Sequence, residues 1–93
     1  MRCLHVCIHG MVQGVGYRFA CQRQAEQLGI LGWVRNRHDG SVEALVAGND
    51  PALRAMQAWF EQGPALARVD RVTVEETTAR PEELSGFSVL PTP

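Results

Sequence analysis

The stretch ILGWVRNRHDGSVEALVAG, residues 30–48, decides the fold of this chain. It contains two extended runs on either side of Asp39-Gly40, and Asp-Gly between such runs is the strongest short signal for a β-hairpin. We therefore predict an extended strand that ends at His38, a tight turn, and a returning strand over residues 41–48. The other elements of the chain flank this hairpin.

Upstream of the hairpin, the sequence predicts a strand, a loop and a helix. Residues 2–9 alternate between apolar and other side chains, as is typical of a half-buried strand. Three glycines within residues 9–16 indicate a loop. Over residues 17–28 apolar side chains recur at helical spacings of 4, 4 and 3, and Gly29 supplies a stop.

Downstream of the hairpin, the sequence predicts a second helix and two further extended segments. Asp50 and Pro51 are expected as the N-cap and the first residue of the helix. An apolar stripe with helical spacing follows, and Gly63-Pro64 ends the helix. We expect a fourth strand over about residues 68–76 and a short extended segment over residues 86–90.

The resulting order is β-α-β-β-α-β. This order predicts an α+β, ferredoxin-like sandwich with two helices on one face of an antiparallel sheet. A chain of 93 residues has room for one core, so residues 1–93 are expected to form a single domain. The fold hosts RNA readers, metal chaperones, amino-acid-binding modules and enzymes, so the function has to be inferred from the site.

The composition excludes several functional classes. All nine basic residues are arginine, which removes chemistry that needs a lysine, such as Schiff bases and Walker-type loops. A formal net charge of −1 disfavours nucleic acid and anionic membranes as partners. There is no secretory signal and no run of about 18 apolar residues, and three cysteines do not indicate a disulfide framework. We therefore expect a cytoplasmic, monomeric protein with free thiols.

Cys3, His5, Cys7 and His9 are all residue types that bind zinc, but their spacing argues against a metal site. Residues two apart on a strand are about 6.7 Å apart, so the outer two of the four are separated by roughly 20 Å. Tetrahedral zinc needs ligand bonds of about 2.0–2.3 Å. We expect no metal, and we expect the four side chains to line one face of a sheet, with the cysteines behaving as small apolar groups.

The segment most informative about function is GMVQGVGYR, residues 10–18. It lacks the Lys-Ser/Thr of a Walker loop and the third glycine of a dinucleotide fingerprint. Its order is nevertheless strand, glycine loop and helix start, where free main-chain amides and the helix dipole attract an anion. Arg18 in the first helical turn can grip two phosphate oxygens. The same pattern also fits a plain loop with a surface arginine.

Alternation along the first hairpin strand predicts where its polar side chains point. Asn36 shares a face with Val34, which lets Asn36 reach a neighbouring loop. Trp33 lies on the opposite face, with Arg35 and Arg37. We expect both arginines to be solvated and Trp33 to be a packing residue.

Three blocks of the sequence resemble the acylphosphatase family. Residues 9–18 are similar to its signature Gly-x-Val-Gln-Gly-Val-x-aromatic-Arg, and residues 28–36 to its Leu-Gly-Leu-x-Gly-Trp-Val-Arg-Asn. Residues 39–44 continue the match in register. The resemblance covers roughly residues 4–90, and the family fold is the same sandwich. Tyr17 stands where the family usually has Phe.

The resemblance implies an enzyme that hydrolyses small-molecule acyl phosphates to a carboxylate and inorganic phosphate, with no metal or other cofactor. It implies that Arg18 binds the phosphate and that Asn36 orients the attacking water. Inorganic phosphate is then expected as product and competitive inhibitor. Because an amide cannot take a proton near neutral pH, Asn36 can only orient the water. The backbone amides expected to cradle the phosphate are those of Gln13, Gly14, Val15, Gly16, Tyr17 and Arg18.

Three alternatives to a free-standing enzyme remain. A nucleic-acid reader of this fold presents aromatic side chains on its central strands, and the corresponding strands here have none. A non-catalytic phosphate-binding module can use the same loop, and only the pairing of Arg18 with Asn36 argues against it. The third is the acylphosphatase-like domain that opens larger carbamoyl-transfer proteins, and a chain that ends at Pro93 favours the free-standing protein.

Overall fold

The computed structural model describes residues 1–93, which form five strands, two α-helices and one short 3-10 helix. In chain order these are β1 (Arg2–Met11), α1 (Tyr17–Leu28), β2 (Leu31–Asn36), β3 (Val42–Gly48), α2 (Asp50–Gln62), β4 (Arg68–Thr77), η1 (Pro81–Leu84) and β5 (Phe87–Val89). Neither α-helix is long and apolar enough to cross a membrane.

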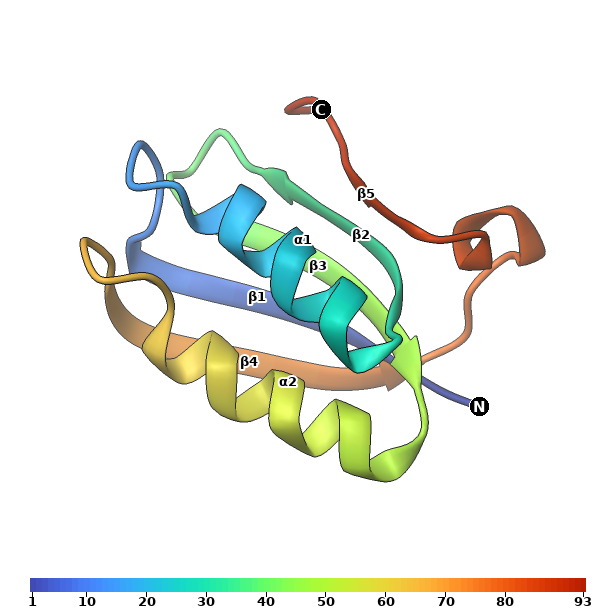
Figure 1. Cartoon of the computed structure of the whole chain (residues 1–93). Helices are drawn as coiled ribbons and strands as arrows, with labels where there is room; N and C mark the ends of the chain where they lie inside the picture. Colours follow the sequence, from blue (N-terminus) through green and yellow to red (C-terminus); the bar gives the residue numbers. More distant parts are fainter.

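The strands form one sheet in the order β4-β1-β3-β2-β5, and both α-helices cover the same face of it (Figure 1). Neighbouring strands from β1 to β4 pair antiparallel, whereas β5 runs parallel to β2. The predicted α+β, ferredoxin-like sandwich is confirmed, but the prediction of an antiparallel sheet was wrong for its last strand. The segment between β4 and β5, which includes η1, carries the chain to the far edge, where it runs in the direction of β2.

The core lies between the sheet and the two helices. Val6 and Ile8 of β1 point into it, which confirms the predicted alternation of that strand. The apolar stripe of α2 is formed by Leu53, Met56 and Phe60, and all three side chains are fully buried. Burying a side chain of this size contributes about 1.5–3 kcal/mol, so the stripe fixes α2 on the sheet.

The start of α2 differs from its prediction by one residue. The N-cap is Asn49, whose side chain accepts a hydrogen bond from the amide of Ala52 at 2.9 Å. The carbonyl of Asn49 already accepts from Leu53 at 3.0 Å, so Asp50 and Pro51 are the first two helical residues. Asn and Asp cap helices about equally well, so the residue types did not decide between them.

The first strand is longer than predicted. The expectation was a strand over residues 2–9, but β1 continues to Met11, which shortens the glycine loop to residues 12–16. A β-bulge before Gly10 allows this continuation, because the register with β4 shifts there. Gly10 has a φ of 136°, and a Cβ atom on it would lie 2.2 Å from the carbonyl oxygen of Arg68. Glycine is therefore required for β1 to pass β4 at this point.

Tyr17 fixes the start of α1 against the end of α2. Its hydroxyl donates a hydrogen bond to the carbonyl of Phe60 at 2.9 Å, and its ring centroid lies 5.1 Å from that of Trp59. Burial raises the pKa of Tyr17 far above its ordinary value, so the hydroxyl remains a donor at any ordinary pH. The first turn of α1, which carries Arg18, is thereby held in place.

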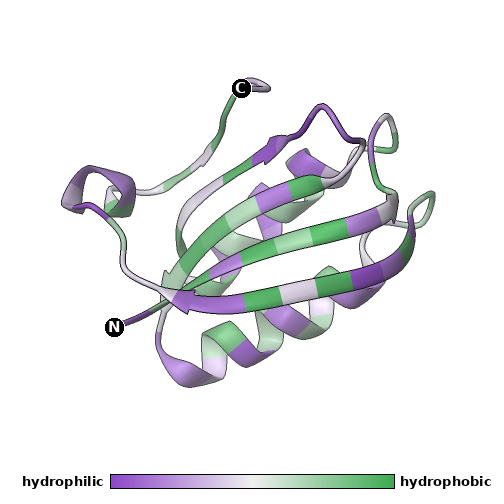
Figure 2. Ribbon diagram, turned by 180° about the vertical axis from the view of Figure 1, so that it is seen from behind, coloured by the Kyte–Doolittle hydropathy of each residue, from purple (hydrophilic) through white to green (hydrophobic).

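The other face of the sheet carries no α-helix, and hydrophilic and hydrophobic residues alternate along its strands (Figure 2). Glu43 of β3 lies at its centre, only 8% exposed, and accepts hydrogen bonds from His5 at 2.6 Å and Arg35 at 2.7 Å. Burial raises the pKa of Glu43, but these two hydrogen bonds outweigh it and leave the pKa below its ordinary value. The expectation of a solvated Arg35 was wrong, because this ion pair and the ring of Trp33, at 4.8 Å, partly bury it.

The three cysteines are unpaired, as predicted. Cys3 is buried on the open face with Leu45 and Ala47, and Cys21 is buried in the main core. Burial raises the pKa of both thiols, so they behave as small apolar groups. Cys7 is half-buried. No group of three His, Cys, Asp or Glu side chains is arranged to hold a metal ion.

Candidate active site

The glycine loop of residues 12–16 connects β1 to α1. Gly14 and Gly16 have left-handed φ angles of 74° and 79°. A Cβ atom on either residue would meet no other atom within 4 Å. Glycine is therefore required at both positions by the left-handed φ angle, and not because a larger side chain would clash with a neighbouring atom. The space beside both of them is open to a ligand.

The backbone amides of this segment are uncommitted. None of the amides from Gln13 to Arg18 donates a hydrogen bond within the chain. Gly16 is the N-cap of α1 and has no side chain to satisfy them, and the amide of Ala20 is the first to bond back, to Gly16 at 3.1 Å. Free amides in a glycine loop at the positive end of a helix dipole form an anion-binding concavity.

Arg18 is the second residue of α1 and is partly buried. Its guanidinium forms no ion pair and no hydrogen bond within the chain, and its central carbon lies 5.9 Å from the ring centroid of Phe19. Arg2 and Arg35, in contrast, are paired with carboxylates. The charge of Arg18 therefore adds to the positive potential of the loop amides beside it.

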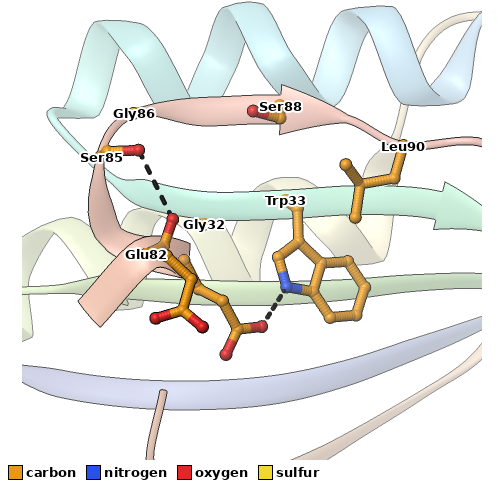
Figure 3. A pocket seen from close by; sticks show the side chains of 8 residues that line it. Gly32, Trp33, Glu82, Ser85, Gly86, Ser88 and Leu90 are labelled. Atoms are coloured by element: carbon orange, nitrogen blue, oxygen red, sulfur yellow. Dashed lines mark hydrogen bonds between the residues drawn. The ribbon is translucent and has the colours of Figure 1, made fainter. Parts of the chain in front are cut away.

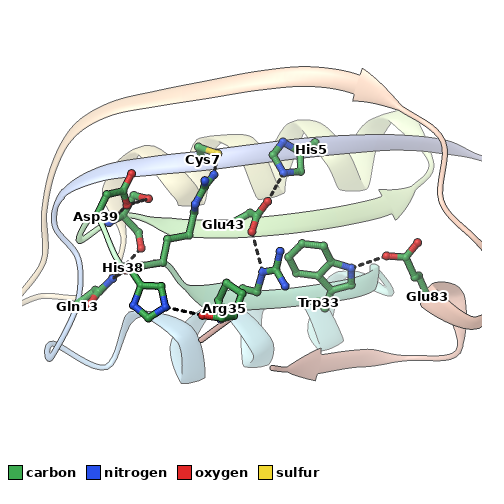
Figure 4. A network of polar contacts seen from close by, with 12 residues as sticks. His5, Cys7, Gln13, Trp33, Arg35, His38, Asp39, Glu43 and Glu83 are labelled. Atoms are coloured by element: carbon green, nitrogen blue, oxygen red, sulfur yellow. Dashed lines mark hydrogen bonds and ion pairs between the residues drawn. The ribbon is translucent and has the colours of Figure 1, made fainter. Parts of the chain in front are cut away.

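Gln13 joins the glycine loop to the turn between β2 and β3 (Figure 4). Its side-chain nitrogen donates hydrogen bonds to the carbonyls of Arg37 and Ser41, each at 2.8 Å. Sequence reasoning considered only the backbone amide of Gln13 and missed this contact. No local pattern could have shown it, because its partners lie 24 and 28 positions further along the chain.

The turn itself is held by its own hydrogen bonds. The predicted hairpin is confirmed, but its first strand ends at Asn36 and not at His38, because the turn begins two residues earlier than expected. The amide of Arg37 donates to the carbonyl of Ser41 at 2.9 Å, and Asp39 accepts from both the hydroxyl and the amide of Ser41. The hydroxyl and then the amide of Ser41 lower the pKa of Asp39 below its ordinary value. Asp39 therefore stays ionised and keeps the turn fixed at and above mildly acidic pH.

Asn36 is the last residue of β2 and lies next to this turn. It pairs with Val42 across the hairpin, and alternation places it on the same face as the buried Val34, as predicted. Its side-chain oxygen is buried and accepts no hydrogen bond, and it is the only buried side-chain nitrogen or oxygen of the chain without a partner. A buried acceptor without a partner costs about 1–3 kcal/mol, which points to a role outside folding.

The single cavity of the structure, of about 180 Å³, lies elsewhere. Its lining comes from β2, η1, β5 and their flanking residues, and Trp33 donates a hydrogen bond to Glu83 there at 2.8 Å (Figure 3). None of the residues predicted to bind phosphate lines it, and neither does Asn36. The candidate site is instead an exposed loop surface made mainly of backbone donors. The residues that line the cavity are Gly32, Trp33, Glu82, Glu83, Ser85, Gly86, Ser88 and Leu90.

The fold and the site define a class of small α+β proteins of ferredoxin-like topology with a glycine loop and an arginine at the start of the first helix. A family model for acylphosphatase matches residues 4–89. The chain belongs to the acylphosphatase family.

Individual relatives agree with this assignment over nearly the whole chain. The chain is 54% identical over 87 residues to an acylphosphatase of Thiobacillus denitrificans, and the match covers 94% of each sequence. It is 49% identical over 86 residues to an acylphosphatase of Thermococcus kodakarensis, with 92% of each sequence covered. The crystal structure of acylphosphatase from Bacillus subtilis superposes with a TM-score of 0.90 at 32% identity, over 97% of this chain and 99% of that one.

Proposed function

We propose that this member of the acylphosphatase family hydrolyses the carboxyl-phosphate bond of an acyl phosphate at the surface formed by the glycine loop and the end of β2. In this proposal the amides of residues 13–18 and the side chain of Arg18 hold the phosphoryl group, and Asn36 orients the attacking water. One observation carries the proposal. Uncommitted amides lie on the glycine loop and an unpaired arginine lies beside it in the first turn of α1. Gln13 ties this loop to the turn that follows the strand bearing the buried, unpartnered oxygen of Asn36.

The loop and Arg18 supply the electrostatic part of catalysis. The water oxygen attacks phosphorus while the bond from phosphorus to the carboxyl oxygen breaks and the carboxylate departs. Negative charge is spread over the phosphoryl oxygens in the transition state, and positioning with charge stabilisation dominates such reactions. Fixed amides and a guanidinium stabilise that charge without reorganising. Because they supply the positive charge that a metal ion would otherwise provide, we propose that no metal takes part.

Asn36 acts on the water. Its side-chain oxygen has no hydrogen-bond partner in the chain. Because this oxygen is closed to solvent in the structure, it accepts a hydrogen bond from the nucleophile once a rotation of the side chain exposes it. An amide does not take up the proton near neutral pH, so the proton passes to an oxygen of the substrate phosphate. The departing carboxylate is a weak base and requires no strong general acid. The products are a carboxylate and inorganic phosphate, and phosphate then competes with substrate for the same loop.

We also propose that the protein acts as a monomer in the cytoplasm, on small molecules and not on nucleic acid. Three free cysteines fit a reducing compartment. The formal net charge of −1 disfavours a polyanionic partner. The centre of the open sheet face is occupied by the ion pairs of Glu43, which is unfavourable for an apolar interface between copies.

Hydrolysis of benzoyl phosphate in the presence of a chelator tests the proposal. We expect turnover by the wild type, with a higher KM and a lower kcat for Arg18→Ala, and a lower kcat at little changed KM for Asn36→Ala. Losing one preorganised donor typically lowers kcat about 10²–10³-fold. Arg23→Ala is the matched control, because Arg23 is an exposed, unpaired arginine of the same helix, and it should keep full activity.

Three outcomes would contradict the proposal. Phosphate binding without turnover would favour the non-catalytic anion-binding module. Full activity of Asn36→Ala would exclude its action on the water. A hydrolysis rate that saturating inorganic phosphate leaves unchanged would mean that the phosphoryl group is held elsewhere.

A further inference from the structure

The glycine loop has one side-chain hydrogen-bonding contact with the rest of the molecule, and Gln13 makes it. The neighbouring loop residues Val12 and Val15 pack on the apolar core. Apolar packing is not directional, so it holds the base of the loop without fixing the position of the loop relative to the turn after β2. The two hydrogen bonds of Gln13, each 2.8 Å long, are directional contacts to Arg37 and Ser41. They therefore set where the loop lies relative to the turn after β2.

We propose that Gln13 is a positioning residue for hydrolysis, whose side-chain amide holds the phosphate-binding loop at a fixed distance from Asn36. This inference rests on the proposed function. The phosphoryl group and the attacking water are held by two separate segments, the β1–α1 loop and the end of β2. In-line attack requires both to be placed together, and a displacement of about 1 Å can cost on the order of 10²-fold in rate.

The chemistry of the contact explains why the residue is a glutamine. Both partners are carbonyl oxygens, so the contact requires two N–H donors on one atom, and a side-chain amide nitrogen provides them. A glutamate of the same length has no donor when ionised. The anchor is itself rigid, because the carbonyl of Ser41 also accepts from the amide of Arg37, and Asp39 holds the amide and hydroxyl of Ser41.

Gln13→Met tests the proposal, because methionine keeps the length of the side chain and removes both donors. We expect kcat for benzoyl phosphate to fall on the order of tenfold to a hundredfold. The loop amides and Arg18 are unchanged, so KM and the inhibition constant for inorganic phosphate should change by less than about threefold. Gln13→Glu should lose at least as much in kcat. If Gln13 served only to stabilise the fold, Gln13→Met would lower the melting temperature but would not lower kcat selectively at constant KM.

Gln22→Met is the matched control. The side-chain nitrogen of Gln22 also donates to a main-chain carbonyl, that of Phe87 at 3.1 Å, but this contact lies on the β5 side of α1. We expect wild-type kcat and KM for Gln22→Met at a temperature where all variants are folded. Loss of kcat in this control equal to that of Gln13→Met would overturn the specific role of Gln13.

A double-mutant cycle with Asn36 tests the coupling itself. In an Asn36→Ala background the water is no longer oriented, so Gln13→Met should cost less in kcat than it does in the wild type. Fully multiplicative effects would overturn the coupling. If the wild type fails to hydrolyse benzoyl phosphate, the proposed function fails first. If the wild type and Arg18→Ala behave as proposed and Gln13→Met keeps wild-type kcat, only the positioning role fails.

Discussion

Replacing Asn36 by leucine should make the protein more stable and nearly inactive. The Asn36 oxygen is buried without a hydrogen-bond partner, and such an acceptor costs about 1–3 kcal/mol of folding free energy. Leucine has nearly the same size and buries no polar atom, so we expect the free energy of unfolding to rise by up to that amount. For a domain of this length each kcal/mol corresponds to roughly 4–8 °C in melting temperature.

The same substitution removes the acceptor that we assign to the attacking water. We expect kcat for benzoyl phosphate to fall about 10²–10³-fold. Urea unfolding gives the stability and a hydrolysis assay gives the activity, and both are measured on the same preparation. A substitution that disturbs packing would lower both the free energy of unfolding and kcat. A rise in the free energy of unfolding together with a fall in kcat therefore identifies a residue retained for catalysis.

Asn49→Leu is the matched control for Asn36→Leu. Asn49 caps α2 through a hydrogen bond of 2.9 Å from the amide of Ala52, so its replacement should cost about 1 kcal/mol and leave activity unchanged. The reasoning on Asn36 is refuted if Asn36→Leu is destabilised like the control. It is refuted equally if the variant keeps its activity.

Three further predictions concern stability. Tyr17→Phe leaves the buried carbonyl of Phe60 without its 2.9 Å donor, so urea unfolding should show a loss of about 1–2 kcal/mol, and an unchanged midpoint would contradict this. Glu43 has a lowered pKa, so its stabilisation is present above the ordinary value of 4.5 and is lost as the pH falls through the lower folded value. Glu43→Gln should therefore flatten the acid side of the stability–pH profile, and an equally steep profile would exclude this role. Gly32→Ala should destabilise the protein far more than Gly29→Ala. Of these two positions, a Cβ atom would meet a carbonyl oxygen, at 1.9 Å, at Gly32 and would meet nothing at Gly29. Equal melting temperatures of the two variants would contradict this.

Much of the fold could be predicted because residues next to each helix or turn in the sequence, such as glycines, mark where the element begins and ends. The helix expected over residues 17–28 has those bounds in the structure, since Gly16 and Gly29 adopt left-handed conformations at its two ends. The direction of β5 could not be predicted in this way. A three-residue strand has too little pattern, and its pairing with β2 depends on where the segment after β4 leads the chain.

The candidate site likewise has features that could be predicted from the sequence and features that depend on the folded chain. Arg18 and Asn36 were recognisable from motif and resemblance, and alternation correctly gave the face on which Asn36 lies. The contact between Gln13 and the β2–β3 turn joins residues 24 and 28 positions apart, so no local periodicity encodes it. The burial of the Asn36 oxygen likewise depends on segments that meet only in the folded chain.

The position of β1 inside the sheet has a consequence for biosynthesis. This strand leaves the ribosome first, yet both of its neighbours, β3 and β4, come later, and its register with β4 extends to Thr77. The nascent chain therefore carries β1, with its apolar residues Leu4, Val6 and Ile8, without a partner until β3 has been made, and with one free edge until β4 has been made. Such nonlocal pairing slows folding, because a long loop must close before any contact compensates for it. The sheet around β1 therefore cannot be complete until β4 has been made.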